Sequence, residues 1–389
     1  MRRILFGVLV GVVLLGGACG SSSKKSASSG QTRTVNVDGT SSQFLGGFLA
    51  YFPNQLTVHP GDSVAFKEIW SGEPHTVTMG TLVEAGLSAA NAAGPNKDPG
   101  PAYDSLPSLL PQGPGDVNQN AGQPCFLDTG APPSNAATPC AKTAQPAFNG
   151  KQAYYNSGFL AKDSTYTVKL ASNIAPGAYH YYCNLHGPTM SGTVTVVAPS
   201  ATIPSQGDVD TKAKSQLDAL SNQMLPAYQA AQAGHIPLPG GVSSNLAGLL
   251  SQSVSNVEVE QFLPANVQAK VGQKVSWTIL GPHTITFGAP ATIPPIITIA
   301  PDGGVHANAQ AGAPSPPPSS PPPAANPNGP PQPQTVDGGT YNGAGFHNSG
   351  IQASFPPGLI TYSLTFTKAG VYAYACMIHP GMTGIVTVS

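Results

Sequence analysis

Two groups of four side chains in this sequence combine histidine, cysteine and methionine in the same order. In each group one histidine comes first, and a cysteine, a second histidine and a methionine follow close together far downstream. The first group is His75, Cys183, His186 and Met190, and the second is His283, Cys376, His379 and Met382. Imidazole, thiolate and thioether groups are metal donors, so both groups are candidate metal sites.

The donor types favour one metal. Two imidazoles and a thiolate in a trigonal plane, with a weak axial thioether, hold copper and let it cycle between Cu(II) and Cu(I). An isolated histidine is usually an ordinary core or surface residue, but here the same four residues, His, Cys, His and Met, recur in order. We expect one copper in each half of the chain, with copper in a single half as the alternative. The histidines without a counterpart in the other half are interpreted as non-ligands: His59, His180, His235, His306 and His347.

The elements around the two groups are repeated as well. Residues 52–78 match residues 263–286, and residues 156–196 match residues 348–388. Within these blocks apolar and polar residues alternate, β-branched and aromatic residues are frequent, and Gly or Pro stands at the ends, which is typical of half-buried strands. The repeat predicts a duplicated domain, and the strand pattern predicts an antiparallel sandwich for each copy.

Both copies resemble the cupredoxin family, which includes plastocyanin, amicyanin, pseudoazurin and azurin. The resemblance rests on the ligand order, on Tyr-x-Tyr-x-Cys (Tyr372, Tyr374 and Cys376) and on Met-x-Gly-x-Val-x-Val. It implies an all-β fold of two cupredoxin-like Greek-key β-sandwiches, each with one type 1 (blue) copper. It also implies that the first histidine comes from an earlier strand and the other three ligands from the loop between the last two strands. The His-to-Met spacing is amicyanin-like in the second copy and one residue longer in the first.

The remaining segments predict a domain order. We expect a signal at 1–19, a flexible Ser-rich tether at 20–32, a first domain at 33–200, a partly helical spacer at 201–254 and a second domain at 255–389. The helix is expected from Asp208 to Gly234, with a kink at Pro226, and packing across both domains is preferred over partner binding for its apolar stripe. The domains carry inserts at 81–151 and 289–345, and we do not expect either insert to contribute to the core. The Pro-rich part of the second insert, 314–334, is expected to be extended.

The N-terminus resembles a bacterial lipoprotein signal. Arg2 and Arg3 precede an apolar run that ends in Gly16-Gly17-Ala18-Cys19. We expect export, lipidation of Cys19 and attachment to the outer face of a membrane, with a plain cleaved signal or an uncleaved anchor as alternatives. Of the five cysteines, Cys125 and Cys140 then remain and are expected to form a disulfide that stabilises the first insert by roughly 3 kcal/mol.

A copper with four protein ligands leaves no position for a substrate, so we expect outer-sphere electron transfer with redox proteins rather than catalysis. By resemblance, electrons would pass through an exposed edge of His186 and His379, which are rimmed by Leu185, Gly187, Pro188, Ile378, Pro380 and Gly381. Copper sequestration or delivery is the alternative. A nitrite reductase or multicopper oxidase is disfavoured, because the sequence has no His-x-His or His-Cys-His and Tyr182 and Ala375 precede the ligand cysteines.

The composition supports no charged partner. Net charge is -1, charged residues make up 8% of the chain, and no basic stripe for nucleic acid is present. The sequence leaves open whether the spacer holds the two sites apart, as independent carriers, or face to face, as a short relay.

Overall fold

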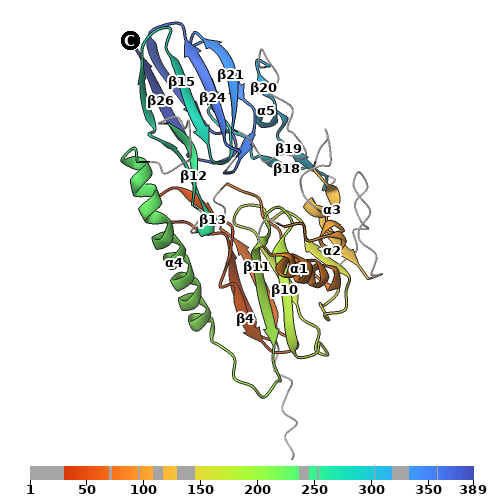
Figure 1. The fold of residues 1–389 in the computed structure, drawn as a ribbon. Helices are drawn as coiled ribbons and strands as arrows, with labels where there is room; N and C mark the ends of the chain where they lie inside the picture. The colour runs from red at the N-terminus through yellow and green to blue at the C-terminus, as the bar shows by residue number, and fades with distance from the viewer. Residues whose placement is uncertain are drawn as a thin grey trace, which may run out of the picture.

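The computed structural model describes residues 30–69, 72–94, 97–107, 117–128, 145–235, 245–251, 254–301, 303–317, 333–356 and 358–389. It contains two β-sandwiches, one above the other in Figure 1, and a long helix, α4, that runs beside both. The predicted all-β class is confirmed, because sheets form both domains and helices are few among the described residues.

The first sandwich packs a four-stranded sheet against a six-stranded sheet. In spatial order the four strands are β3 (Tyr51–Phe52), β1 (Thr32–Val37), β5 (Ser63–Glu68) and β9 (Thr165–Lys169). The six strands are β4 (Gln55–Val58), β11 (Gly187–Val196), β10 (Gly177–Cys183), β6 (Thr78–Met79), β8 (Tyr154–Ser157) and β7 (Pro124–Leu127).

Strand β11 illustrates why these segments form half-buried strands. Val194 and Val196 are buried, whereas Thr193 and Thr195 are only half-buried. Successive side chains of a strand point to opposite faces, so the valines join the core and the threonines do not. The same alternation continues back to Met190, which therefore enters the core as well.

The second sandwich has two six-stranded sheets. One contains β2 (Gly46–Phe48), β13 (Val254–Leu263), β12 (Leu246–Ser251), β15 (Lys274–Ile279), β24 (Ile360–Phe366) and β21 (Gln334–Tyr341). The other contains β14 (Asn266–Ala269), β26 (Thr383–Val388), β25 (Gly370–Ala375), β17 (Thr286–Phe287), β22 (His347–Ser349) and β20 (Pro314–Ser315). Two small sheets add β16 (Gly281–His283) with β23 (Gln352–Ser354), and β18 (Ile297–Ile299) with β19 (Val305–Ala307).

The two sandwiches share one strand order. The parallel pair β1 and β5 corresponds to β12 and β15, and the parallel pair β4 and β11 corresponds to β14 and β26. The antiparallel series β11, β10, β6, β8, β7 corresponds to β26, β25, β17, β22, β20. Equivalent strands therefore lead to the first histidine and flank the ligand loop in both domains.

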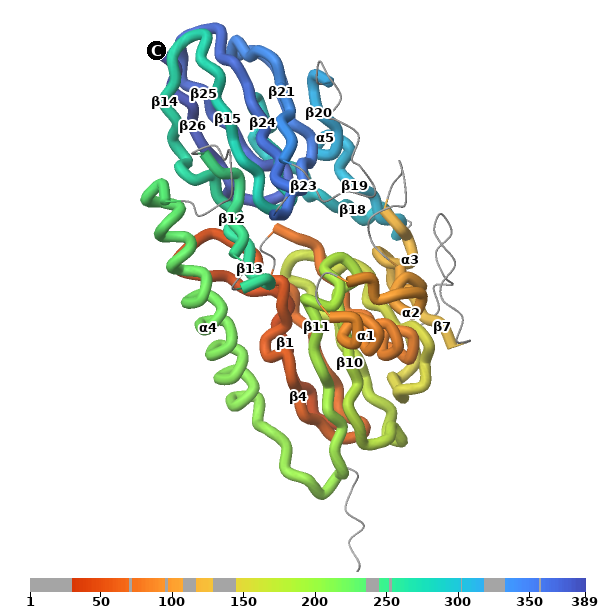
Figure 2. Tube along the Cα trace, in the orientation of Figure 1, coloured from red at the N-terminus to blue at the C-terminus, as the bar shows by residue number. Residues whose placement is uncertain are grey.

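The expected spacer helix is α4, which spans Gln206–Gln232 and includes Pro226. Ser205 and Asp208 form a capping box at its start, which satisfies backbone N–H groups of the first turn. Its apolar stripe is covered by both domains: α4 packs against β1 and β3 of the first and β12 and β13 of the second. Figure 2 shows the helix beginning beside the first domain and ending beside the second.

The domains also share a sheet and a core. Strand β2 comes from the first part of the chain, yet it pairs antiparallel with β13, with Phe48 opposite Val257. A common apolar cluster contains residues of the first domain, of α4 and of the second domain, including Phe44, Phe48, Met224, Leu246 and Leu263. The two domains are thus joined by main-chain hydrogen bonds and by buried apolar surface.

The expectation that neither insert contributes to the core was wrong. β7 and β20 extend the six-stranded sheets, and Val83 and Leu87 of α1 (Thr81–Ala93) are buried. β7 and β20 each form backbone hydrogen bonds with the edge strand of a sheet. This pairing favours a strand conformation in segments whose side chains alone do not predict a strand. Of the Pro-rich part, Pro314–Ser315 is strand β20, and residues 318–332 lie outside the described residues.

The inserts also contact each other across the domain boundary. They contain the short helices α2 (Pro101–Asp104), α3 (Gln119–Gly122) and α5 (Ala309–Gly312). The Gln119 side chain donates to the Val305 carbonyl (2.7 Å) and accepts from its N–H (2.9 Å). Val117, Ala121, Phe159 and Val305 form a small apolar cluster around this contact.

Four predictions concern residues outside the described part. The signal with Cys19 and nearly all of the tether lie within 1–29, so export, lipidation and tethering stay predictions. Cys140 is also outside, while Cys125 is buried in β7, so their disulfide stays a prediction. Among the described helices, none has the length and hydropathy needed to cross a membrane.

Candidate metal centres

The fold places both predicted ligand groups at matching positions. In the first domain His75 precedes β6, Cys183 ends β10, and Met190 lies in β11. In the second, His283 ends β16, Cys376 follows β25, and Met382 precedes β26. His186 and His379 lie on the loops between these last strands. The hairpin therefore supplies three side chains of each group, and the fourth comes from the neighbouring strand region.

In the first domain the donor atoms converge in the core. The Nδ1 atoms of His75 and His186 are 3.2 Å apart, and donor atoms of these two residues and Cys183 lie within 4.8 Å of one another. Cys183 and Met190 are both 0% exposed and belong to the same apolar cluster. The donor atoms of His75, Cys183 and His186 thus converge, and Met190, the fourth residue predicted for the first site, is buried in the core that contains Cys183.

The second domain repeats this geometry. The Nδ1 atoms of His283 and His379 are 3.0 Å apart, and Cys376 Sγ lies 4.0 Å and 3.7 Å from them. Cys376 is 0% and Met382 1% exposed, in one apolar cluster. Two imidazole nitrogens and a sulfur that face one point, with a thioether in the same core, fit a copper ion better than a hard cation that prefers oxygen.

The surroundings of each cysteine favour its thiolate form. Burial alone raises the pKa of the Cys183 and Cys376 thiols, but His186 and His379, together with the first histidine of each group, lower both pKa values well below the ordinary one. The backbone N–H groups of Thr76 and Thr284 each donate to the sulfur at 3.4 Å. Because the thiolate is the form that ligates metals, these contacts favour metal binding.

Equivalent polar contacts hold the ligand loop in each of the two domains. The hydroxyl of Thr76 accepts from the N–H of Asn184 (2.9 Å), and the hydroxyl of Thr284 accepts from the N–H of Met377 (2.7 Å). Each threonine also contacts a second threonine, which donates to an asparagine: Thr78 to Asn156, and Thr286 to Asn348. The repeated Asn-Ser-Gly, to which the sequence assigned no role, thus supports the segment that carries the first histidine.

The two first histidines differ in their outer partners. Nε2 of His283 lies 3.0 Å from the Leu280 carbonyl, whereas Nε2 of His75 lies 3.5 Å from Oδ2 of Asp38. Asp38 and Glu68, both 0% exposed, form a buried group with His75. The first site therefore has buried carboxylates beside its first histidine, where the second has a neutral carbonyl.

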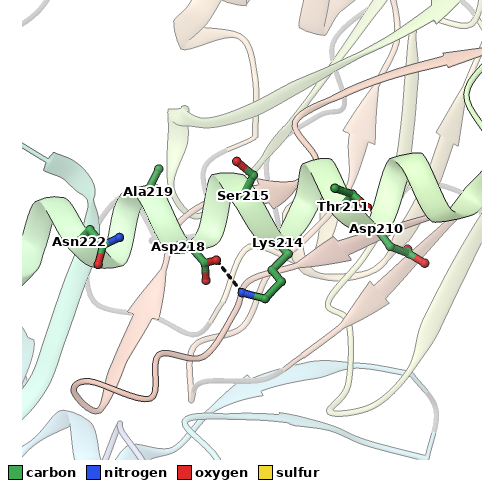
Figure 3. A pocket seen from close by; sticks show the side chains of 7 residues that line it. All are labelled: Asp210, Thr211, Lys214, Ser215, Asp218, Ala219 and Asn222. Atoms are coloured by element: carbon green, nitrogen blue, oxygen red, sulfur yellow. Dashed lines mark hydrogen bonds and ion pairs between the residues drawn. The ribbon is translucent and has the colours of Figure 1, made fainter.

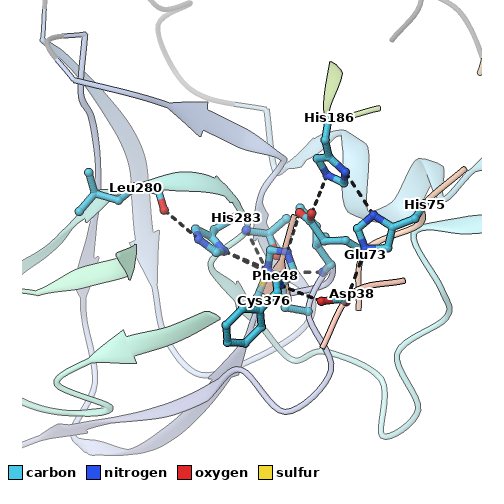
Figure 4. Close-up of polar contacts among 11 residues, drawn as sticks. Asp38, Phe48, Glu73, His75, His186, Leu280, His283 and Cys376 are labelled. Carbon is cyan, nitrogen blue, oxygen red and sulfur yellow. Dashed lines mark hydrogen bonds and ion pairs between the residues drawn. The ribbon is translucent and has the colours of Figure 1, made fainter. Parts of the chain in front are cut away.

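A third carboxylate connects the two sites. Oε2 of Glu73 lies 2.8 Å from Nε2 of His186 (Figure 4), and Oε1 lies 3.3 Å from Nε2 of His379. Burial by itself raises the pKa of Glu73, but its interactions with the two histidines hold that pKa well below the ordinary value. The sites therefore face each other across one shared anion.

This arrangement corrects the expected exposure of the ligand-loop histidines. The side chain of His186 is 10% exposed and that of His379 is 0% exposed, because each faces the other domain. Ile378 of the expected apolar rim is buried as well, although Pro380 and Gly381 are exposed. The histidine edges point into the domain boundary and do not form a surface patch.

Two further acids near the boundary were not predicted. Glu258 and Glu260 lie in β13 and are 6% and 0% exposed. Burial, and then the charge of Glu73, raises the pKa of Glu258 to about 8, and burial raises that of Glu260 well above its ordinary value. The sequence pattern that could have predicted this pair is an acidic residue at every second position of an otherwise apolar strand, because such spacing places both carboxyl groups on one face.

The remaining histidines make other contacts or stand apart from both groups. His59 Nε2 lies 2.8 Å from the Ala201 carbonyl, His180 Nδ1 lies 2.6 Å from Glu84, and His347 Nε2 lies 3.0 Å from the Tyr362 hydroxyl. None of the metal-type groups among the described residues includes these three, His235 or His306.

A shallow depression on α4 contains no ligand residue. It is lined by polar side chains such as Asp210, Lys214, Asp218 and Asn222 (Figure 3). Lys214 and Asp218 form an exposed ion pair one helical turn apart, which is an ordinary surface contact.

No protein-family model and no curated protein matches the chain. Among solved structures, it is similar to auracyanin from Roseiflexus castenholzii, with 19% identity, 43% of this chain and 98% of that chain covered, and a TM-score of 0.23. It is similar to an amicyanin variant at 14% identity, with 43% and 82% covered and a TM-score of 0.21. A copper-containing nitrite reductase from Thermus scotoductus has 13% identity, with 92% and 68% covered and a TM-score of 0.22. At these values the similarities carry no argument about ligands or function, which rest on this chain's own residues.

Proposed function

We propose that this protein transfers electrons through two type 1 copper sites, one in each domain. The observation that carries the proposal is the convergence of a His, Cys and His group in each of two equivalent cores, with a buried methionine in each core. His75, Cys183, His186 and Met190 would hold one copper, and His283, Cys376, His379 and Met382 the other. Bound there, copper supplies a one-electron Cu(II)/Cu(I) couple.

The residues around the ligands suit electron transfer because they hold the donor set in place. Thr76 and Thr284 fix the ligand loops, and the N–H donors to sulfur stabilise thiolate charge. Burial of both cysteines and methionines keeps water away from the donors. A rigid, dry site changes little between the two charge states, which lowers the reorganisation that each transfer requires.

Electron transfer is preferred over copper storage and over catalysis. Storage or delivery requires ligands that release metal, whereas Cys183 and Cys376 are 0% exposed. A nitrite reductase or multicopper oxidase needs additional histidines beside the ligand cysteine, where this chain has Tyr182 and Ala375. We further propose that redox proteins are the partners and that the chain is exported and attached to a membrane through a lipid on Cys19.

The experiment is a visible absorption spectrum with copper counted per chain, on the protein from Gly20 to Ser389 loaded with Cu(II). We expect an intense thiolate-to-copper band and two coppers per chain. Cys183→Ser and Cys376→Ser should each remove one type 1 copper and leave the other band. Absence of the band in the parent protein would sink the electron-carrier proposal, and a single copper would reduce it to one site.

A further inference from the structure

The Glu73 carboxylate lies between the two candidate copper sites and contacts a ligand histidine of each. Its oxygens are 2.8 Å from His186 Nε2 and 3.3 Å from His379 Nε2. All three side chains are at most 10% exposed. The contact therefore crosses the domain boundary in a place from which bulk water is largely removed.

The hydrogen-bond chemistry of this contact is defined by the ring atoms. In both sites the Nδ1 atoms face the other donors, so Nε2 is left to carry a proton. An ionised carboxylate has no proton to donate and can accept one N–H at each oxygen. Glu73 therefore accepts from both histidines, and its charge strengthens both hydrogen bonds.

The repeat departs from symmetry at this position. Glu73-Pro74-His75 of the first copy corresponds to Gly281-Pro282-His283 of the second. A Cβ atom on Gly281 would lie 3.3 Å from Glu258 Oε2 and 3.3 Å from His283 Nε2, so the second copy has little space for a glutamate there. One carboxylate, provided by the first copy alone, serves both sites.

The segment that carries Glu73 is fitted to the second domain. Gly72 has a φ of +134°, and a Cβ atom there would lie 2.5 Å from Pro380 Cδ and 3.3 Å from His379 Cα. Only glycine allows this approach of the chain to the second ligand loop. This backbone conformation thus places Glu73 directly beside His379.

We propose that Glu73 is a positioning residue that couples the two copper sites, so that electrons move between them through His186, the Glu73 carboxylate and His379. This inference rests on the proposed function and extends it from two independent carriers to one relay. With copper bound in both sites, each transfer would move one electron from Cu(I) in one site to Cu(II) in the other. No bond forms or breaks, and both Nε2 protons stay on their rings.

The test requires two sites that can be distinguished. Met382→Gln replaces the axial donor of the second site, which should shift its band and potential away from those of the first. Pulse radiolysis then adds less than one electron per protein, and redistribution appears as one band recovering while the other bleaches. A rate independent of protein concentration identifies transfer within the molecule.

Glu73→Ala and Glu73→Gln are compared in this background. Gln keeps the side-chain size but directs an NH₂ group at one imidazole N–H, so only one of the two hydrogen bonds survives. We expect redistribution to be slower by about tenfold or more in both variants, as is typical for loss of a group that orients ligand histidines. Glu84→Ala is the matched control, because it removes a carboxylate that contacts His180 away from both sites, and its rate should equal the parent rate.

A second readout needs no copper. In the metal-free protein, NMR should detect slowly exchanging Nε2–H protons of His186 and His379, and Glu73→Ala should lose both. Unchanged redistribution in both Glu73 variants, or unchanged imidazole protons, would overturn the inference. Failure of the proposed function is seen separately and earlier, as a parent protein without two blue coppers.

Discussion

At the scale of single residues, the two ligand groups are alike and their surroundings are not. Thr76 and Thr284 make equivalent contacts to the cysteine and the ligand loop. Asp38 lies beside His75, whereas the Leu280 carbonyl accepts the same contact in the second site. A buried anion near a metal stabilises its higher charge state, so identical ligands need not give identical potentials.

The buried acids at the boundary should make stability depend on pH. Burial, and then Glu73, raises the pKa of Glu258 from 4.5 to about 8, so between these values the folded protein binds a proton that the unfolded chain does not. The contribution of Glu258 to the stability of the metal-free protein should therefore fall as pH rises from about 4.5 to about 8, by at most about 1.4 kcal/mol per pH unit. Glu258→Gln should flatten that slope in urea unfolding at several pH values.

The control for this measurement is Asp210→Asn, which changes an exposed carboxylate on α4. It should leave the slope as in the parent protein. An unchanged slope in Glu258→Gln would contradict a protonated Glu258 in the folded state.

At the scale of elements, the decisive piece is the short segment that precedes His75. It crosses from the first sandwich to the ligand loop of the second, and Gly72 packs against Pro380. The contact places Glu73 between two loops that each come from a hairpin of strands, β10 with β11 and β25 with β26. A local backbone conformation thus determines how the two sites are related.

Gly72→Ala should loosen this contact. The residue has a φ of +134°, and the new Cβ would meet Pro380 Cδ at 2.5 Å, so both backbone strain and a clash are expected. We expect a loss of about 1–3 kcal/mol in the free energy of unfolding, measured with urea.

Gly94→Ala provides the comparison, since Gly94 also has a positive φ of +81° but nothing within 4 Å of the added Cβ. Its effect reports backbone strain alone. If the two variants lost equal free energy of unfolding, the packing of Gly72 on Pro380 would make no contribution to stability.

At the scale of the whole molecule, contacts on different parts of the boundary join the domains. They include the shared core of α4, with the pairing of β2 and β13, and the contact of Gln119 with Val305. A continuous sheet and a common core do not separate without exposing apolar surface. The domains should therefore behave as one cooperative unit.

Calorimetry of the metal-free protein should show a single transition, with equal calorimetric and van't Hoff enthalpies. Met224→Ala, in the shared core at 0% exposure, should lower stability by about 2–5 kcal/mol and move the whole transition. Lys214→Ala, on the exposed face of the same helix, should change it by less than about 0.5 kcal/mol. Two separate transitions, of which Met224→Ala moves one, would mean that the domains unfold independently.

The sequence by itself determined the types and order of the candidate ligands and the strands that carry them. Alternation in 190–196 and 382–388 indicates which face of a strand is buried, and the apolar stripe that begins near Asp208 predicts the helix α4. Both patterns are local, because the residues that form each of them lie within a few positions of one another in the sequence. The repeat extended them to both domains, because each copy supports the interpretation of the other.

Only the tertiary structure decided that the two sites face each other. Glu73 is 113 positions from His186 and 306 from His379, so no spacing in the sequence links it to either. Three other features likewise depend on surfaces that meet only after folding. They are the pairing of β2 with β13, the burial of both ligand-loop histidines, and the addition of β7 and β20 to their sheets. Residues that contact one another across a domain boundary share no local period, and for that reason the connection between the sites appears only in three dimensions.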